Sequence, residues 1–245
     1  MNIDHPTLTQ IPQLRALWKE AFGDTDSFLD TFFGTAFAPE RCLYVTVDGE
    51  IAAAAYWFSC GQYAYIYAVA TAKQHQGRGY CHALMGKIHA LLRWQGYDGC
   101  IVVPGDESLR RFYAEMGYEN FGGIEEFSCI ADAPLPLRKI ETEEFAALRR
   151  QYLPEGGVVQ EGENLAFLSR WAEFYAGADF LLAATREGET LRGLELLGNP
   201  NVAPGILTAL EAKNGTFRTP GHTPFAMYQS LGAKNPPTYF GFAFD

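Results

Sequence analysis

A polar stretch with two glycines lies between an apolar run and a helical pattern, and it is the part of this sequence best suited to chemistry. The stretch covers residues 71–81 and includes Gly77 and Gly79. The apolar run 65–70 precedes it. The helical pattern that follows is carried by Leu84, Met85, Ile88, Leu91 and Leu92. We therefore predict a turn that joins a buried strand to the first turn of an amphipathic helix.

Such a turn can bind an anion through its backbone. The first amides of a helix have no partner within the helix, and the helix dipole makes that end partly positive. Glycine lets the backbone bend tightly and approach a ligand closely. A phosphate or pyrophosphate can therefore be held by N–H groups alone. The alternative interpretation is a plain strand–helix connection that contains two glycines.

Length and composition fit a globular protein with one large domain or two small ones. The chain has 245 residues, of which 48% are hydrophobic and 20% are charged. No apolar run approaches the roughly 18 residues of a membrane span. The first residues, Met1–His5, lack the basic segment followed by an apolar one that marks a signal peptide. We therefore expect a cytoplasmic protein with no membrane partner.

Charge and cysteine usage exclude further classes of protein. The net charge of -10 argues against a nucleic-acid partner and is compatible with a cationic substrate such as an amine. The cysteines form no C-x-x-C pair, so we expect buried thiols rather than disulfides or a zinc site. No carboxylate or thiol completes a ligand set around the histidines of residues 75–89, so we expect no metal. The cysteines are Cys42, Cys60, Cys81, Cys100 and Cys129, and the histidines are His75, His82 and His89.

The first half of the chain reads as two helices, an antiparallel meander of strands, and a strand–helix crossover. The strand after the crossover should lie parallel to the strand before it. The predicted helices are 9–23, 24–36, 80–95 and 109–116, and the predicted strands are 42–47, 51–58, 63–70, 100–103 and 118–130.

A plausible linker with Pro134 and Pro136 opens the second half, so we predict domains at 1–130 and 131–245. Predicted helices there are 142–152, 164–175, 204–212 and 224–231, and predicted strands are 180–185, 191–197, 215–219 and 238–244.

Two segments, 103–117 and 219–232, look alike, because a Pro-Gly pair, a tyrosine and a glycine four residues after it coincide. We interpret them as parts of two related halves, with chance similarity as the alternative. The second half has no counterpart of the glycine turn. Pro200 and Pro204 lie at the corresponding place and remove two amide donors. Only the first half should therefore bind an anion.

These features together resemble the GCN5-related N-acetyltransferases (GNAT). The resemblance covers residues 8–125 and rests on the paired helices, the hairpin, the strand ending Val69-Ala70-Thr71, the glycine turn, and Phe112-Tyr113-x-x-x-Gly117-Tyr118. It implies an α/β fold with a mixed, mostly antiparallel central sheet flanked by helices. The second half is similar to a smaller, degenerate GNAT-like copy, as in tandem members of the family.

The family's loop pattern is Arg or Gln, two residues, Gly, one residue, then Gly or Ala. Gln74-x-x-Gly77-x-Gly79 matches it literally, whereas Gln76-x-x-Gly79-x-Cys81 departs from it at Cys81. We prefer the second register, because Leu84-Met85 then fall where the family's helix carries its first apolar pair.

The resemblance implies an acyltransferase that moves an acetyl group from acetyl-CoA to a primary amine of a small molecule or peptide. Tyr113 takes the family's general-acid position, and the amide of Val69 is a candidate donor to the oxyanion. Asp106 stands where the family often has an asparagine that contacts the cofactor. The residues implied in cofactor binding are Val69, Ala70 and Thr71 for the pantetheine arm, and Gln76, Gly77, Arg78, Gly79, Tyr80 and Cys81 for the pyrophosphate.

The general base and the acceptor are left open by the sequence. Candidates for the base are Glu125, Glu126, Glu195, the tyrosines of residues 63–67, and the C-terminal carboxylate of Asp245. Aromatic residues available as walls of an acceptor pocket are Trp18, Phe32, Trp57, Trp171 and Tyr175. The alternative function is a non-catalytic acyl-CoA-binding or sensing protein. A nucleotide-binding protein is disfavoured, because the turn lacks a Gly-Lys-Ser/Thr ending.

Overall fold

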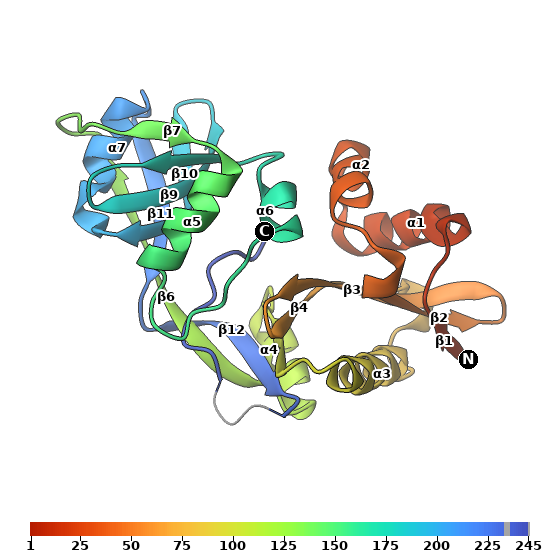
Figure 1. Cartoon of the computed structure of the whole chain (residues 1–245). Helices are drawn as coiled ribbons and strands as arrows, with labels where there is room; N and C mark the ends of the chain where they lie inside the picture. The colour runs from red at the N-terminus through yellow and green to blue at the C-terminus, as the bar shows by residue number, and fades with distance from the viewer. Residues whose placement is uncertain (233–235, 245) are drawn as a thin grey trace. The chain divides into compact units, whose positions relative to one another are not determined.

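The computed structural model describes residues 1–232 and 236–244, which fall into two compact units by their contacts (Figure 1). The first unit contains Met1–Glu119 and Met227–Pro236, and the second contains Asn120–Ala226 and Pro237–Asp245. We predict the domain boundary between residues 130 and 131. The contact units differ from it, because residues 120–130 belong to the second unit and Met227–Pro236 to the first. That boundary stays a prediction.

The first unit is a mixed sheet of strands in the order β1-β2-β3-β4-β5-β12, in which β4 and β5 are parallel and the other neighbours antiparallel. This arrangement confirms the predicted fold class and the parallel crossover. Its strands are β1 (Asn2–Asp4), β2 (Cys42–Val47), β3 (Glu50–Cys60), β4 (Tyr63–Thr71), β5 (Gly99–Val102) and the end of β12 (Thr223–Ser230). Its helices are η1 (Leu8–Gln10), α1 (Ile11–Phe22), α2 (Asp26–Thr35), η2 (Pro39–Arg41), η3 (Lys73–His75), α3 (Tyr80–Trp94) and α4 (Glu107–Glu115).

Helices cover both faces of this sheet, because its central strands are apolar on both sides (Figure 1). On one face, the apolar stripe of α3 packs on residues that include Val45, Ala53 and Trp57. On the other face, Trp18 of α1 lies 5.0 Å from the ring of Tyr56. Trp57 and Trp18 are therefore on opposite faces, so the expectation that they wall one acceptor pocket is wrong.

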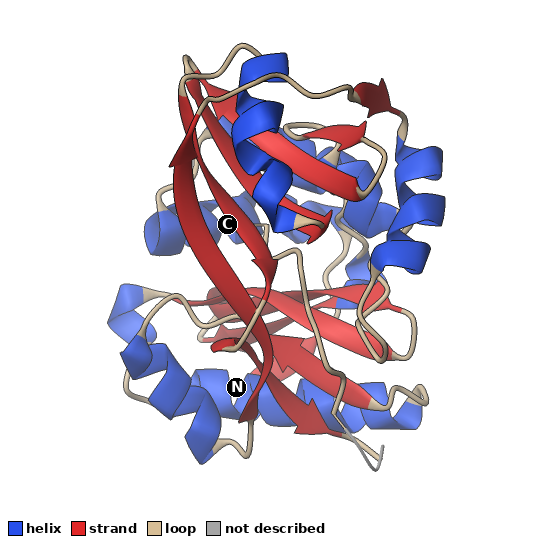
Figure 2. Cartoon of the chain, turned by 90° about the vertical axis from the view of Figure 1, so that its left-hand side faces the viewer, coloured by secondary structure: helices blue, strands red, loops and turns tan. Residues whose placement is uncertain are grey.

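The second unit is a sheet in the order β6-β11-β10-β9-β8-β7, in which β10 and β11 are parallel. Figure 2 shows helices flanking the strands. Phe145 of α5 stacks on Phe174, whereas Tyr175 packs with the α7 residues, so α5 and α7 cover opposite faces. The strands are β6 (Glu119–Ile130), β7 (Arg138–Ile140), β8 (Glu173–Ala176), β9 (Phe180–Glu187), β10 (Thr190–Gly198) and β11 (Asn214–Pro220), and the helices are α5 (Thr142–Tyr152), α6 (Glu163–Leu168), η4 (Pro200–Val202) and α7 (Ala203–Ala209).

Three predicted elements of the second half are wrong. The helix predicted at 164–175 ends at Leu168, and Glu173–Ala176 instead form β8. The helix predicted at 224–231 is the strand β12. Residues 238–244 form no strand. The amide of Thr238 donates to the carbonyl of Gly156, and the backbone of Phe242 bonds to the side-chain amide of Gln160.

The internal repeat is present, but not in the alignment that the sequence indicated. Residues 107–115 are helical, whereas their proposed counterpart contains the strand β12. The recurring order is instead strand, two helices, three antiparallel strands, helix and parallel strand. It runs from β1 to β5 in the first unit and from β7 to β11 in the second. Residues 199–202, with Pro200, thereby lie where the first unit has its glycine turn.

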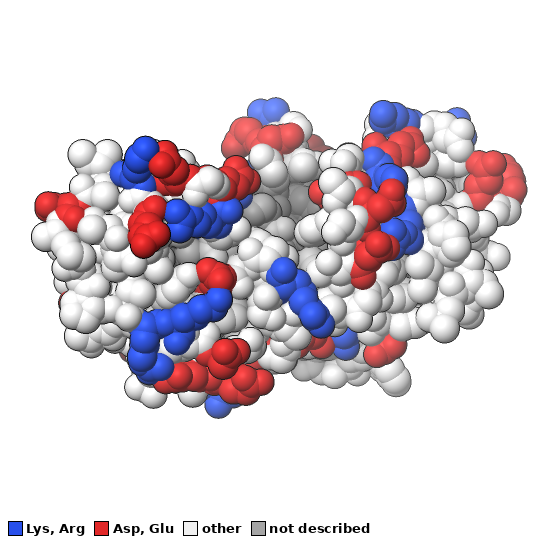
Figure 3. Space-filling model, turned by 90° about the horizontal axis from the view of Figure 1, so that it is seen from above, with Lys and Arg blue, Asp and Glu red and all other residues white. Residues whose placement is uncertain are grey.

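Surface charge is mixed in sign. On the face shown in Figure 3, basic and acidic side chains are interspersed, with no field of a single sign. Within the described residues, no helix is both long and apolar enough to cross a membrane. The five cysteines are free, and Cys42, Cys60 and Cys100 are buried as expected.

Candidate functional site

The strand β4 changes course just before the glycine turn. Its pairing with β5 covers only Tyr63–Tyr65, so the two parallel strands part beyond that point. On its other side, Ala68 and Val69 together oppose Ala55 of β3, which makes a β-bulge. Ala68 has a φ of 49°, a value that few residues other than glycine adopt. The bulge therefore turns the backbone of residues 68–71 at the place where the sheet opens.

The turn after β4 ends at a helix start that no side chain caps. Gly79 is the N-cap of α3, with a φ of 78°, and no side chain caps the helix. Gly77 has a φ of 70°. A Cβ added at either glycine meets no atom within 4 Å, so the glycines are needed for their backbone conformation rather than for lack of space. The helix begins at Tyr80, and the open space in front of its first turn fits an anion.

A cavity of about 350 Å³ joins this turn to Tyr113. Of the residues predicted to bind the cofactor or act in catalysis, Ala70 and Arg78 do not line it. Ala70 is buried in the sheet, and Arg78 is exposed. The lining residues are Val69, Thr71, His75, Gln76, Gly77, Gly79, Tyr80, Cys81, His82, Leu109, Phe112 and Tyr113. The roles assigned to them stay predictions, but their types and spacing did lead to one place in the fold.

The helix α4 delivers Tyr113 to the cavity. Asp106 begins the helix, because its Oδ1 accepts a hydrogen bond of 2.8 Å from the amide of Leu109 and one of 2.7 Å from the hydroxyl of Ser108. These bonds hold the pKa of Asp106 below its usual value. The carboxylate thus bonds to the first turn of its own helix. Asp106 is therefore the cap of α4, at the position where the family often has an asparagine.

Tyr113 is enclosed by aromatic and sulfur-containing side chains. Its side chain is 7% exposed, and its ring lies 5.4 Å from Phe112 and 5.5 Å from Tyr118. Burial, with a smaller contribution from Cys81, raises the pKa of the phenol. The hydroxyl therefore keeps its proton at neutral pH and is available as a donor. Burial likewise raises the pKa of Cys81 to about 11, so Cys81 is a thiol rather than a nucleophilic thiolate.

Four lining residues were missed as site residues in the sequence. Two had a usable signal: Leu109 precedes Tyr113 by one helical turn, and Phe112 belongs to the Phe-Tyr motif itself. His82 lies in the first turn of α3, and His75 lies in η3, a short helix that the sequence did not indicate.

Two carboxylates considered as general bases are held by cations in the second unit. Glu195 is 1% exposed, and its oxygens accept hydrogen bonds of 2.7 and 2.9 Å from Arg149. The hydroxyl of Tyr239 donates a further one at 3.1 Å. Glu126 accepts one of 3.0 Å from Arg218. This geometry makes Glu195 a structural residue. Asp245 lies outside the described residues.

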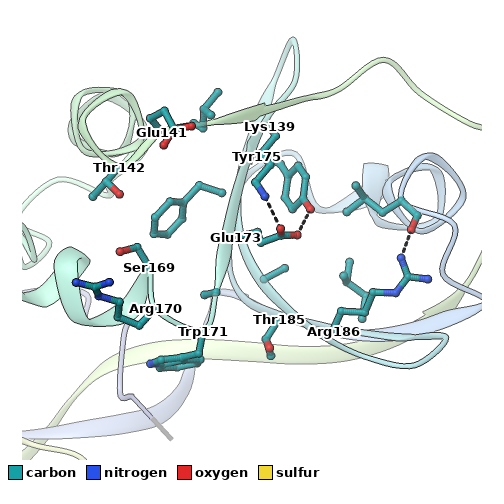
Figure 4. Close-up of a pocket in the computed structure, with 16 residues that line it drawn as sticks. Lys139, Glu141, Thr142, Ser169, Arg170, Trp171, Glu173, Tyr175, Thr185 and Arg186 are labelled. Carbon is teal, nitrogen blue, oxygen red and sulfur yellow. Dashed lines mark hydrogen bonds and ion pairs between the residues drawn. The ribbon is translucent and has the colours of Figure 1, made fainter. Parts of the chain in front are cut away.

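A second cavity, of about 590 Å³, belongs to the second unit (Figure 4). At its centre Glu173 accepts hydrogen bonds from Lys139 and, at 2.5 Å, from the hydroxyl of Tyr175. Arg186 donates to the carbonyl oxygens of Leu210 and Glu211 at 2.7 and 2.8 Å. Glu173 is thus paired with Lys139 and Tyr175, and Arg186 with backbone carbonyls. Trp171 and Tyr175, considered as acceptor-pocket walls, line this separate cavity.

Comparisons with known proteins agree with this geometry. Residues 2–121 match the model of an acetyltransferase (GNAT) domain. A GCN5-related N-acetyltransferase from Anabaena variabilis has a TM-score of 0.75 and 16% identity, covering 94% of this chain and 72% of its own. One from Kribbella flavida has a TM-score of 0.71 and 18% identity, covering 94% and 71%. A putative acetyltransferase from Pyrococcus horikoshii has a TM-score of 0.68 and 14% identity, covering 99% and 94%. No curated protein matches the sequence.

The domain match and the fold agree on the class of domain that the first unit contains. Residues 2–121 of this chain belong to the GCN5-related N-acetyltransferase (GNAT) family. The solved structures cover both units, so their likeness extends to the fold of the second one.

Proposed function

We propose that this protein transfers an acetyl group from acetyl-CoA to a primary amine, with Tyr113 as general acid. One observation supports this above the others. A single cavity joins the uncapped first turn of α3, the bulged end of β4 and a buried, protonated phenol. An anion site, an open strand edge and a proton donor are the three things that acyl transfer from a coenzyme A thioester requires.

Each part of the cavity has its own task in this proposal. The backbone amides from Gly77 to Cys81 bind the pyrophosphate, and residues 69–71 pair with the pantetheine arm. The amide of Val69 stabilises the oxyanion that forms when the amine nitrogen attacks the thioester carbonyl. As the carbon–sulfur bond breaks, Tyr113 gives its proton to the leaving thiolate. The amine loses a proton to solvent, and the phenolate of Tyr113 takes one back from solvent. Protons therefore balance over the cycle.

The acceptor in this proposal is a small molecule or peptide that carries a primary amine. The net charge of -10 supports a cationic acceptor over an acidic one. A panel of amines offered with acetyl-CoA and followed by release of free thiol tests this directly. Activity confined to acidic or nucleic-acid-bound acceptors contradicts it.

Replacement Tyr113→Phe tests the chemical role. The ring and its packing remain, so coenzyme A should bind with unchanged affinity in calorimetry. Turnover should fall by about 100-fold, the lower end of what a general acid contributes. Unchanged turnover sinks the general-acid role. Tight coenzyme A binding by the native protein, with no amine ever acetylated, instead favours an acyl-CoA-binding or sensing protein.

A further inference from the structure

A hydrogen bond ties the helix α1 to the start of the glycine turn. Oε1 of Glu20, near the end of α1, accepts a hydrogen bond of 2.9 Å from the backbone amide of Lys73. Lys73 is the first residue of η3, the short helix that follows β4 and leads into the turn. The two residues are 53 positions apart in the sequence. The bond therefore joins separate elements rather than neighbours along the chain.

The bond supplies a cap that the turn itself lacks. The first amides of a helix have no acceptor within the helix, and the N-cap residue of η3 is Ala72, whose side chain cannot accept one. Glu20 provides that acceptor from another element. Its carboxylate is charged, and hydrogen bonds to a charged acceptor are stronger than those between neutral groups.

The other bonds of the turn lie within it or tie it to β3. The amide of Ala72 donates to Ala52 at 2.9 Å, and Nε2 of Gln74 donates to the exposed Glu50 at 3.0 Å. Within η3, the amide of His75 donates to the carbonyl of Ala72 at 2.8 Å. Beyond it, the amide of Gln76 reaches the carbonyl of Lys73 at 3.4 Å, and the Gln76 side chain reaches Thr71 at 3.3 Å. The anchor at Lys73 therefore adds a bond to α1 to the two bonds to β3 that order the amides facing the cavity.

The anchor comes from the side of the sheet opposite α3. Trp18 of α1 packs on Tyr56, whereas α3 packs with Trp57 on the other face. Glu20 thus reaches around the end of β4 to the turn that opens α3. We propose that Glu20 is a positioning residue that pre-orders the glycine turn for the pyrophosphate and links it to α1. This inference rests on the proposed function.

Removing the Glu20 side chain would change two things at once. It would break the hydrogen bond to Lys73, and it would also remove a negative charge that repels an anion bound nearby. Two neutral replacements separate the effects. Glu20→Gln keeps an oxygen acceptor, whereas Glu20→Met has similar length and no acceptor for the amide. Both lose the charge equally, so their difference reports the hydrogen bond alone. Glu40→Met, which removes a carboxylate that is exposed on η2, serves as a general control.

The test compares coenzyme A with pantetheine, which lacks the pyrophosphate. Glu20→Met should bind coenzyme A about 3- to 10-fold more weakly than Glu20→Gln, the range expected for one hydrogen bond. Both variants should bind pantetheine alike in a titration followed by nuclear magnetic resonance. Hydrogen exchange of the amides from Lys73 to Gly79 should be faster in Glu20→Met than in Glu20→Gln.

Each outcome bears on one proposal. Equal coenzyme A affinity and equal exchange in the two variants overturn the role of Glu20. An equal loss for coenzyme A and pantetheine also overturns it, because a general structural defect does not discriminate between them. If the native protein binds no coenzyme A, the proposed function fails instead, whereas the exchange measurement still decides whether Glu20 orders the turn.

Discussion

Burial keeps the side chains around the cavity in their neutral forms. The phenol of Tyr113 and the thiol of Cys81 both have raised pKa values for this reason. Behind them, Nε2 of His89 lies 2.7 Å from the hydroxyl of Tyr118, which is fully buried. A neutral imidazole therefore supports the aromatic layer on which Tyr113 packs. Water exclusion and proton retention at this site have the same physical origin.

His89 should make the fold sensitive to acid. Burial, followed by the charges of Arg93 and His82, lowers its pKa from 6.5 to about 4. The unfolded chain then binds more protons than the folded one between these values, so stability is complete above pH 6.5 and falls toward pH 4. Between pH 7 and pH 4, the native protein should lose about 2–3 kcal/mol more than the variant His89→Gln.

Urea unfolding at a series of pH values measures this difference. Glutamine can still bond to Tyr118 but does not titrate, which makes His89→Gln a matched control. Identical pH profiles for the two proteins contradict the assignment.

At the scale of the element, the start of α3 and its interior impose opposite demands on glycine. Gly79 has a φ of 78°, whereas Gly86 lies inside the helix, is exposed, and has open space where a Cβ would be. Gly79→Ala should destabilise the protein by about 1–2 kcal/mol, because alanine is strained at a left-handed position. Gly86→Ala should stabilise it by up to about 1 kcal/mol, because alanine is the better helix former.

Thermal unfolding and coenzyme A titration of the two variants check this prediction. Only Gly79→Ala should weaken binding, since only that position shapes the uncapped first turn. Equal stability changes of the same sign would show that the turn has relaxed to a different conformation. Unchanged coenzyme A binding in Gly79→Ala would remove the turn from the proposed site.

Much of the first unit is predictable because its signals are local. Thr25 caps α2, Gly23 ends α1 with a φ of 75°, and Asp48-Gly49 make the hairpin turn, all as their residue types indicate. The glycine turn and the Phe112-Tyr113 motif are local signals too, and the residues that they indicate line one cavity. The bulge at Ala68 carried no such signal, because alanine does not favour a positive φ, and only the pairing with β3 imposes it.

The second unit was less predictable because tertiary contacts decide its ambiguous segments. Residues 223–230 carry apolar side chains at spacings that fit a helix, yet they form β12, because Met227–Ser230 pair with β5. Glu173–Ala176 similarly read as the end of a helix. They form β8 because β7 and β9 both pair with them. In each case a partner strand that is distant in sequence, β5 for β12 and β7 for β8, contributes to the pairing, and no local pattern identifies it.

At the scale of the whole molecule, the same order of elements occurs twice, but the glycine turn occurs once among the described residues. The segment between β10 and α7 contains Pro200, and Pro204 lies in the first turn of α7. Prolines lack the amide hydrogens that an anion site needs. Calorimetry should therefore find one coenzyme A bound per chain, and Gly79→Ala should weaken that single event. Two equivalent binding events would contradict this assignment.

The second unit instead uses its interior to hold the C-terminal residues. Arg149 of α5 and Glu195 of β10 form a buried ion pair, the Tyr239 hydroxyl donates to it, and the Arg149 guanidinium lies 4.6 Å from the ring of Phe242. A Cβ at Gly241 would stand 1.7 Å from Oε1 of Glu195, so the backbone there packs directly on the carboxylate. The pair thus fixes residues 239–242 within the fold.

Breaking the pair should therefore cost far more than replacing it. Arg149→Met leaves Glu195 buried without its cation, which should destabilise the protein by about 3–5 kcal/mol. Glu195→Leu alone strands the arginine at a similar cost. The double variant removes both charges and should recover most of the loss, because a well-packed apolar pair often equals a buried ion pair. Urea unfolding of the four proteins gives the coupling energy. If the losses in free energy of unfolding of the two single variants add up in the double variant, Arg149 and Glu195 act independently. Packing around Phe242, rather than the ion pair, would then hold the C-terminal segment.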